Sequence, residues 1–529
     1  MIWNRRISMM LLGILLLTLP VMAADTLSVN CPSSGAPGAA ITCSVSLALG
    51  SDMIDNFTFG VSVAPSVPGA TPASNVKFND ATSNGPFQSG TTTAVSAVYQ
   101  GVSPLFTGTV ALGTVKFTAP ATAPGGAFYT VTITGASGQN DTVVPNTTPT
   151  INAGPAVTVY LPALGTNSLL VGPSAGTSSV LLKFPGAWTA TSNSSFLHVA
   201  SGSASGTGNA LIVFTYDANA GTTSRTGTLT IAGVTFTVTQ TPTNYAGPGG
   251  LNTLLSAGLS TPWGTAVDSS GNVYLADQGN AAIKEWTAST QQISTLVSSL
   301  SSPAGVAVDG AGNVYFADSV ANTISEWNAG TTQVTALVST GLSSPTGVAL
   351  DTSGNVYFAD QGNNAIKEWV ASTQQVTTLV SSGLNAPTGV AVDILGNVYF
   401  ADKSNNAIKE WVASTQQVTT LVSTGLNTPH GVAVDGSGNV YFADKGNGAV
   451  KEWVAATQQL STLVGAGAPS PRGVAVDVAG NLYISDSSNN SLLEFTNAYV
   501  GPANGLSESS APGTDTLLAV IPSTQPLTG

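Results

Sequence analysis

Side chains that could carry out chemistry are scarce in this chain of 529 residues. Its two histidines, His198 and His430, lie in different parts of the sequence, and no His-Glu-x-x-His, Gly-x-Ser-x-Gly or Walker motif occurs. A zinc site needs several nitrogen or sulfur ligands. We therefore predict no catalytic residue, no metal ligand and no cofactor. Calcium binding stays open, because carbonyl and carboxylate oxygens suffice for it.

Aspartates are the most regular ionisable residues, because two of them recur in a pattern that is present six times. The pattern reads P-x-G-x-A-V-D-x-x-G-N-V-Y-x-A-D-x-x-N-x-x-I-K-E-W, and successive copies begin 41 or 42 residues apart. A catalytic group is normally needed once, so we expect these aspartates to brace turns and loops, and the recurring tryptophans to pack between repeats. The two sets of aspartates are Asp268, Asp309, Asp351, Asp393, Asp435 and Asp477, and Asp277, Asp318, Asp360, Asp402, Asp444 and Asp486.

The candidate binding residues stand where the six copies differ. The residue between Pro and Gly is, in order, Trp263, Ala304, Thr346, Thr388, His430 and Arg472. The residue after the second Asp is Gln278, Ser319, Gln361, Lys403, Lys445 and Ser487. Neighbouring copies four, five, six and one therefore bring one cluster together: Trp263, His430 and Arg472, flanked by Lys403 and Lys445. A cationic rim with one aromatic ring suits an anionic or sugar-like ligand. The alternative is neutral drift between duplicated repeats.

Within this cluster each side chain has a predicted role. Arg472 offers a planar donor fork for a carboxylate or sulfate, and Trp263 offers a flat apolar face for a ring. We expect His430 to add charge only in mild acid, given a reference pKa of about 6.5.

The elements that position these residues are short strands, four in each copy. In the third copy they are predicted at 347–350, 356–359, 365–369 and 375–380, with an Asp-x-x-Gly-Asn turn between the first two. Four antiparallel strands in about 42 residues make a propeller blade. We therefore predict a six-bladed β-propeller over residues 242–500, with the candidate cluster at the mouth of its central channel.

One strand of the sixth copy is missing from its expected place. That copy ends at residues 492–495, whereas a matching segment at 251–255 precedes the first copy. We predict that this early segment completes the last blade.

The rest of the chain is also predicted to be strands. Residues 24–160 contain several short alternating strands separated by Gly, Pro and Ala, which is typical of a β-sandwich. Residues 161–241 predict a second small sandwich that ends in a hairpin across Ala232 and Gly233. Residues 501–529 form a Gly/Ser/Pro-rich tail. The predicted fold class is all-β: two sandwiches followed by a propeller.

The first 23 residues are typical of a secretory signal peptide. Arg5 and Arg6 precede an apolar run at 9–19, and Ala23 ends a small-x-small cleavage site. We expect the protein to be secreted or on the cell surface, with a retained anchor as the alternative. In an oxidising compartment the only two cysteines, Cys31 and Cys43, are predicted to form a disulfide.

Composition limits the partners. Only 7% of residues are charged and the net charge is −13, so nucleic acid and anionic membranes are not expected as partners. No segment after the signal is apolar enough to span a bilayer.

Three family resemblances follow from the sequence. The P-x-G-x-A-V-D and G-N-V-Y-x-A-D blocks resemble NHL repeats, which build six-bladed propellers. Residues 161–241 resemble a BACON domain, which implies carbohydrate binding, although Phe196 stands where many members have Trp. Residues 24–160 resemble a cohesin-type, immunoglobulin-like sandwich, and the tail resembles the start of a further BACON-type domain. The residues that carry the BACON resemblance are Trp188, Ser194, Ser195, Phe196, Leu197, Ser224, Arg225, Thr226, Gly227, Val238, Thr239 and Gln240.

Two hypotheses on function follow. The first is a non-enzymatic extracellular binding or scaffold protein whose propeller face recognises a protein or carbohydrate ligand. The second, which rests on six-bladed relatives with a metal on the channel axis, is a metal-dependent propeller lyase or lactonase. A stoichiometric, tightly bound divalent ion would favour the second.

Overall fold

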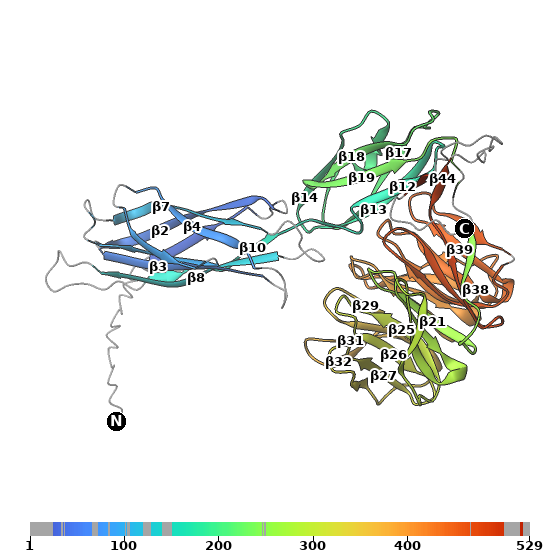
Figure 1. Ribbon diagram of the computed structural model, residues 1–529. Coiled ribbons are helices and arrows are strands. Elements are labelled where there is room, and N and C mark those ends of the chain that lie inside the picture. The colour runs from blue at the N-terminus through green and yellow to red at the C-terminus, as the bar shows by residue number, and fades with distance from the viewer. Residues whose placement is uncertain are drawn as a thin grey trace, which may run out of the picture.

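The structure is a computed structural model in which strands are the dominant element (Figure 1). The predicted signal peptide at 1–23 and most of the predicted tail lie outside the described residues. All elements of the described residues are strands or single turns of 3-10 helix, so the all-β prediction is confirmed. No helix in this part of the chain is long and apolar enough to cross a membrane. The described residues are 25–32, 35, 38–54, 56–65, 72–82, 85–91, 93–100, 102, 106–119, 128–139, 151–245, 247, 250–465, 467–501 and 519–521.

The first part of the chain forms two five-stranded sheets that share one hydrophobic core. Buried and exposed residues alternate along β1 and β3, because successive side chains of a strand point to opposite faces. Leu27, Val45 and Phe59 belong to the shared core. The likeness to a cohesin-type module stays a prediction. The strands of one sheet are β4 (Ser74–Asp80), β7 (Phe106–Thr118), β2 (Ala40–Ile54), β1 (Asp25–Asn30) and β9 (Ile151–Ala153). Those of the other are β10 (Val157–Tyr160), β8 (Phe128–Gln139), β3 (Asn56–Pro65), β6 (Ala94–Tyr99) and β5 (Phe87–Gly90).

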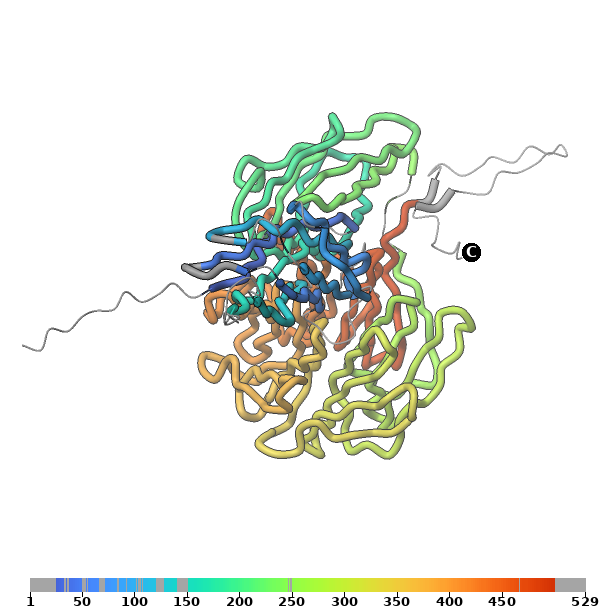
Figure 2. The backbone as a smooth tube through the Cα atoms, turned by 90° about the vertical axis from the view of Figure 1, so that its left-hand side faces the viewer, coloured from blue at the N-terminus to red at the C-terminus, as the bar shows by residue number. Residues whose placement is uncertain are grey.

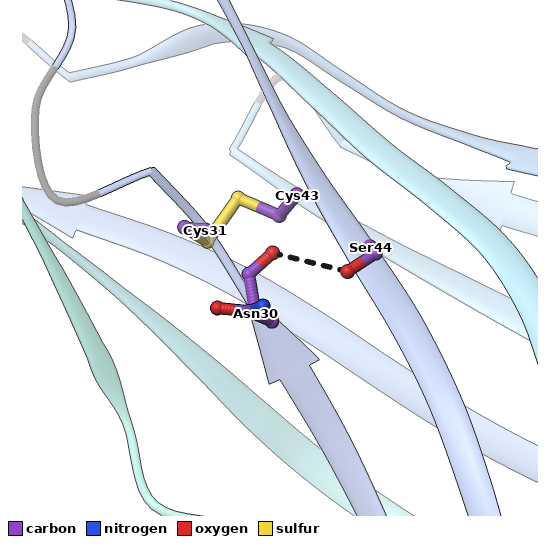
Figure 3. The surroundings of a disulfide bond; sticks show 4 residues. All are labelled: Asn30, Cys31, Cys43 and Ser44. Carbon is purple, nitrogen blue, oxygen red and sulfur yellow. Dashed lines mark hydrogen bonds between the residues drawn. A yellow bond between two sulfur atoms is a disulfide. The ribbon is translucent and has the colours of Figure 1, made fainter.

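A disulfide joins the ends of β1 and β2, as the sequence predicts. Cys31 and Cys43 are bonded, with their Cα atoms 4.1 Å apart. Beside the bond, the Ser44 hydroxyl donates to the Asn30 carbonyl oxygen at 3.4 Å (Figure 3). The bridge therefore reinforces a pair of strands that are already hydrogen-bonded to each other.

The second part of the chain packs two smaller sheets around Phe214, Phe236 and Trp188. The hairpin between β18 and β19 turns at Ala232 and Gly233, which both have positive φ, as a two-residue hairpin turn of this type requires. This confirms the predicted hairpin. One sheet consists of β11 (Ala163–Leu164), β13 (Gly176–Lys183), β17 (Ala210–Tyr216) and β15 (Leu197–Val199). The other consists of β12 (Ser168–Val171), β19 (Val234–Gln240), β18 (Arg225–Ile231), β14 (Ala187–Ser192) and β16 (Ser205–Thr207), and a 3-10 turn, η2, spans Ser201–Ser203.

The six repeats fold into four-stranded antiparallel sheets, which we number one to six and together call the repeat region. Sheet one contains β21 (Pro262–Val267), β22 (Val273–Asp277), β23 (Ala282–Thr287) and β24 (Gln292–Val297). Sheet two contains β25 (Pro303–Val308), β26 (Val314–Asp318), β27 (Thr323–Trp327) and β28 (Val334–Val338). Sheet three contains β29 (Pro345–Leu350), β30 (Val356–Asp360), β31 (Ala365–Val370) and β32 (Gln375–Val380).

The remaining sheets follow the same order, except that the sixth takes its outer strand from another place in the chain. Sheet four contains β33 (Pro387–Val392), β34 (Val398–Asp402), β35 (Ala407–Val412) and β36 (Gln417–Val422). Sheet five contains β37 (Pro429–Val434), β38 (Val440–Asp444), β39 (Ala449–Val454) and β40 (Gln459–Val464). Sheet six contains β41 (Pro471–Val476), β42 (Leu482–Asp486), β43 (Ser491–Phe495) and β20 (Leu251–Leu255). After sheet six, β44 (Tyr499–Gly501) pairs with β45 (Ala519–Ile521).

Strand β20 pairs antiparallel with β43, so the segment before the first repeat does complete the last sheet. Figure 2 shows the start of the repeat region lying beside its red end. The predicted role of residues 251–255 is confirmed by this pairing.

The sheets pack face to face, which explains why their second strands are apolar on both sides. Every residue of β30, for example, is buried. Tyr315 and Ala317 of sheet two form one core with Phe358 and Trp369 of sheet three. The recurring tryptophans therefore pack between sheets, as predicted.

Glycines set the spacing of the innermost strands. A Cβ at Gly305 would lie 2.1 Å from the carbonyl oxygen of Thr346 in the next sheet, and a Cβ at Gly473 of sheet six would lie 2.4 Å from that of Trp263 in sheet one. Only a residue without a side chain permits this approach. The same contact recurs between all six neighbouring pairs, so the series returns from the last sheet to the first. The other glycines are Gly264, Gly347, Gly389 and Gly431.

The second pair of sheets contacts the repeat region at sheet five. The backbone amide of Leu181 donates to the Gly436 carbonyl at 3.1 Å, and the buried Ser179 hydroxyl donates to the Ser437 carbonyl at 2.8 Å. Gly165 and Gly436 also face each other so closely that a Cβ at either would overlap the other. The contact is thus made largely by backbone.

Candidate binding site at the channel mouth

The side chains between Pro and Gly are presented by an irregularity in each innermost strand. In sheet one, Pro262 pairs with Asp277, but the register shifts before Thr265 pairs with Leu275. The same kind of shift occurs in the innermost strand of each repeat sheet. A bulge changes the direction of the side chains within it, and here five of the six residues between Pro and Gly line a common axial cavity: Trp263, Ala304, Thr388, His430 and Arg472.

Three of the predicted site residues contact one another. The guanidinium carbon of Arg472 lies 4.4 Å from the centroid of the Trp263 ring. The ring of His430 lies 5.9 Å from that of Trp263, in an edge-on arrangement with an interplanar angle of 61°. Residues from sheets five, six and one therefore form one cluster, as the order of the repeats predicts.

The cavity beneath this cluster is narrow. It has a volume of about 50 Å³, which is room for very few water molecules. Its wall is mostly glycine and valine from the innermost strands, with Trp263, His430 and Arg472 among the lining residues. A ligand much larger than a few water molecules therefore does not fit wholly within the cavity.

Lys403 and Lys445 complete the cluster from the loops after the second strands. Each is the first residue of a 3-10 turn, η5 (Lys403–Asn405) or η6 (Lys445–Asn447), and each follows a fully buried aspartate. The same turn occurs in sheets one and three as η3 (Gln278–Asn280) and η4 (Gln361–Asn363), where its first residue is glutamine.

The positive charges of the cluster act on His430. Burial, followed by the charges of Lys403, Arg472 and Lys445, lowers the pKa of His430 to about 3. Burial and the other two cations also lower the pKa of Lys445, and burial lowers that of Arg472. The expectation that His430 gains charge in mild acid is therefore wrong. The sequence does not show that this side chain is only 4% exposed.

The cations of the cluster have no acidic partner among the described residues. The ion pairs there join His198 to Asp217, or four lysines of the repeats to the aspartates that end their second strands. In addition, Nε of Arg472, Nδ1 of His430 and Oγ1 of Thr265 are buried without a hydrogen-bond partner. The mouth thus combines unpaired positive charge with unused hydrogen-bonding atoms.

Both sets of recurring aspartates are braces, as predicted. Asp351 accepts hydrogen bonds from the backbone amides of Ser353 at 2.8 Å and Asn355 at 3.0 Å, and from the hydroxyl of Tyr357 at 3.2 Å. Equivalent bonds recur in the other repeats.

The second aspartate of each repeat is buried at the end of the second strand. Asp360 accepts from the Ser343 amide at 2.7 Å and pairs with Lys367 at 2.6 Å. All six carboxylates of this set are at most 3% exposed. They hold the loop from which Lys403 and Lys445 project.

Several residues near the mouth were not identified from the sequence. Ser485 stands where the other repeats have alanine, and its hydroxyl donates to the carbonyl of Trp263 and accepts from the amide of Gly473. Thr346 and Thr388 donate hydroxyl hydrogen bonds to carbonyls of the next sheet. Departure from the repeat pattern is a signal for Ser485, but the pattern does not reveal which strand its partner comes from.

No group of three or more His, Cys, Asp or Glu side chains in the part of the chain that the structure describes is arranged to hold a metal ion. The sequence predicts that Trp263 offers a flat face to a sugar ring, but the guanidinium of Arg472 covers one face of the indole.

Comparison with known families and structures agrees with the repeats. Residues 165–246 match the model of the viral BACON domain, and residues 259–286 and 469–495 match that of the NHL repeat. No curated protein matches the sequence.

Three solved structures illustrate the level of structural similarity. A nidogen/laminin complex has 22% identity, a TM-score of 0.37 and coverage of 42% of this chain and 86% of its own. A streptogramin B lyase has 15% identity, a TM-score of 0.38 and coverage of 46% and 96%. A catalytically inactive virginiamycin B lyase from Staphylococcus aureus with quinupristin has 13% identity, a TM-score of 0.37 and coverage of 61% and 99%. Likeness at this level says nothing about function. The chain thus has one segment that matches the BACON domain model and two that match the NHL repeat model, within an all-β architecture.

Proposed function

We propose that the repeat region is a six-bladed β-propeller and that the protein is a non-enzymatic, secreted or cell-surface binding protein. Its propeller would hold a protein or carbohydrate ligand at the channel mouth, through Trp263, His430 and Arg472 with Lys403 and Lys445. One observation carries the proposal: three cations meet at the mouth, and none has an ion-pair partner among the described residues.

The energetic argument is that such an arrangement is costly without a ligand. Buried polar atoms without partners cost about 1–3 kcal/mol each, and Nε of Arg472 and Nδ1 of His430 are of this kind. The like charges of Arg472 and Lys403, which together with burial lower the pKa of Lys445, add to the cost. A ligand that carries negative charge and hydrogen-bond acceptors would offset both.

The same electrostatics disfavour the lyase or lactonase hypothesis. A divalent cation on the channel axis would lie near Lys403, Lys445 and Arg472, whose charges already resist protonation of His430. Their repulsion would weaken metal binding, even though a neutral imidazole is a good ligand.

Export and the N-terminal sheets complete the proposal. A disulfide between Cys31 and Cys43 suits an oxidising compartment, in agreement with the predicted signal at 1–23. We propose that the two N-terminal units, over 24–160 and 161–241, act as spacers or carbohydrate-binding modules for the propeller at 242–500.

The test is a screen of the intact mature protein against a glycan array and a panel of extracellular proteins. The affinity of any ligand found is then measured for Trp263→Ala and Arg472→Ala. The controls are Ala304→Ser and Thr346→Ser, which change the same position in other repeats. We expect the first two to abolish binding and the second two to retain it. If all four variants bind alike, the site lies elsewhere on the molecule.

A further inference from the structure

We infer that the channel mouth selects a doubly charged oxyanion group, such as sulfate, phosphate or a phosphate monoester, and that Trp263 positions Arg472 instead of stacking on the ligand. The inference rests on the site of the proposed function and assigns its ligand chemistry.

The first step concerns Trp263. Its ring carries the Arg472 guanidinium at 4.4 Å on one face and the His430 ring at 5.9 Å. A guanidinium held on an indole face is fixed in orientation while its N–H groups stay free to donate at its edge. Trp263 therefore acts on a ligand through Arg472, which makes it a positioning residue.

The second step is the count of charge. Lys403, Lys445 and Arg472 act together on His430, which itself stays neutral because its pKa is about 3. A single negative charge would leave two of the three cations without compensation. A dianion compensates two, and its several oxygens can accept from more than one donor at once.

The third step is the supply of hydrogen-bond donors. Nε of Arg472 is buried without a partner and carries one N–H. Nδ1 of His430 is also without a partner on a ring that is 4% exposed and lines the cavity. The neutral ring donates from one nitrogen and accepts at the other, so the guanidinium of Arg472 and the lysine ammonium groups are the donors on which the inference relies.

The fourth step is the shape of the mouth. Because the channel volume is only about 50 Å³, a compact oxyanion group can approach these donors while the molecule to which it is attached stays outside. A neutral sugar ring would find the indole face already in use on one side.

The experiment is calorimetric titration of the full chain with sodium sulfate, phosphate and acetate at pH 7.5, with ionic strength held constant by sodium chloride. We expect one sulfate or phosphate per chain and affinity for acetate at least about tenfold lower. The other repeats show which neutral residues fit these positions. The position of Arg472 is threonine in two repeats (Thr346 and Thr388), and the position of the two lysines is glutamine in two repeats (Gln278 and Gln361). Arg472→Thr, Lys403→Gln and Lys445→Gln should each lower sulfate affinity by about tenfold or more, as expected for loss of a charge-assisted contact.

Two further variants separate specific from general effects. Lys77→Gln removes an exposed charge from β4, far along the chain, and should leave sulfate affinity unchanged. Trp263→Phe keeps an aromatic face for Arg472, whereas Trp263→Thr does not. We expect Trp263→Phe to retain the preference for sulfate over acetate and Trp263→Thr to lose most of it. Because an inorganic ion has no ring to stack on the indole, loss of direct stacking would not explain this difference.

The outcomes are distinguishable. Equal affinity for sulfate, phosphate and acetate overturns the inference, and so does a loss of sulfate affinity in Lys77→Gln equal to that in the mouth variants. If a macromolecular ligand requires Arg472 but sulfate does not bind, the oxyanion inference fails and the proposed function stands. If sulfate binds as expected but no macromolecule depends on the mouth, the inference stands and the proposed function fails.

Discussion

His430 occupies a position that is threonine in two sister repeats, and its environment keeps it neutral over the physiological pH range. Burial and three nearby cations oppose its protonation in the folded state. In the unfolded chain its pKa returns to about 6.5. The folded protein therefore binds fewer protons than the unfolded chain between these two pKa values, and its stability falls as pH decreases through this window.

This difference gives a pH-dependent prediction. Between pH 6.5 and the folded pKa of about 3, the wild type should lose up to about 1.4 kcal/mol of unfolding free energy per pH unit relative to His430→Thr. Above pH 7 this contribution is absent. Denaturant unfolding of both proteins at pH 7.5, 5.5 and 4.5 measures it, and the shared carboxylates cancel in the difference. A difference that does not change with pH would contradict the assigned burial of His430.

Ser485 makes the second prediction at this scale. Its buried hydroxyl connects Trp263 of sheet one with Gly473 of sheet six. Ser485→Ala leaves the Gly473 amide without this acceptor, which should cost about 1–3 kcal/mol of unfolding free energy. Ser488→Ala, at an exposed side chain three residues further on, is the control and should cost almost nothing. Equal melting temperatures for the two variants would show that the bond contributes nothing.

Residue-level prediction from the sequence succeeded where the cause is local. The turn aspartates bond to amides two and four residues later, and such bonds follow from sequence distance alone. The burial of His430 and the partners of Ser485 depend on chains of contacts from sheet to sheet. These contacts join residues that are far apart in the sequence: 167 positions separate His430 from Trp263 (430 − 263 = 167), and 222 separate Ser485 from Trp263.

At the scale of elements, strand β20 has the largest consequence, because it precedes the first repeat in the sequence but pairs with the last repeat. Deleting residues 249–259 removes the partner of β43 and also removes Leu259, which packs in the core between sheets six and one. We expect a lower melting temperature and self-association through the exposed edge of β43.

The control for this deletion is the missing strand itself. A synthetic peptide of residues 249–259 should raise the melting temperature of the truncated protein and restore the monomer in light scattering, whereas a scrambled peptide should do neither. An unchanged melting temperature after deletion would mean that the ring does not depend on β20.

Strand boundaries within the repeats could be predicted well, because the same turn residues and apolar segments recur in six copies. Sequence predicted the turn at 351–355, and β29 and β30 end and begin on either side of it. The irregular register at each Pro-x-Gly was not predicted. It arises because the glycine packs against a carbonyl of the next sheet, which no pattern within one repeat reveals.

At the scale of the whole molecule, the second pair of sheets contacts the Asp-x-x-Gly-Asn turn of sheet five, which is one of six equivalent turns in the repeat region. Gly436 occupies this turn, and its carbonyl accepts from the Leu181 amide. The equivalent residue of sheet two is Gly310, around which there is open space, and that of sheet three is Thr352. The interface could not be predicted from the repeats, since nothing in their sequence pattern indicates which turn another unit will cover.

These equivalent positions supply a matched pair of variants. Gly436→Thr places a Cβ about where the carbonyl group of Gly165 lies, at 2.3 Å, so the two units must separate. Gly310→Thr should be accommodated. We expect faster hydrogen exchange at Leu181 and a larger radius of gyration for the first variant only, with the repeat region of both variants melting as in the wild type. Unchanged protection of Leu181 in Gly436→Thr would contradict the contact.

The pairing of β20 with β43 can form only after almost the whole repeat region has been synthesised. From Leu251 to Ser491, 240 positions separate the starts of these two strands (491 − 251 = 240). At about 5–20 residues per second, a ribosome needs roughly 12–48 s to make the intervening chain. During this time β20 has no partner strand, while the ribosome synthesises five nearly identical repeats after it. A chain that stays unfolded until all of it has been made would avoid premature pairing of β20 with the wrong repeat.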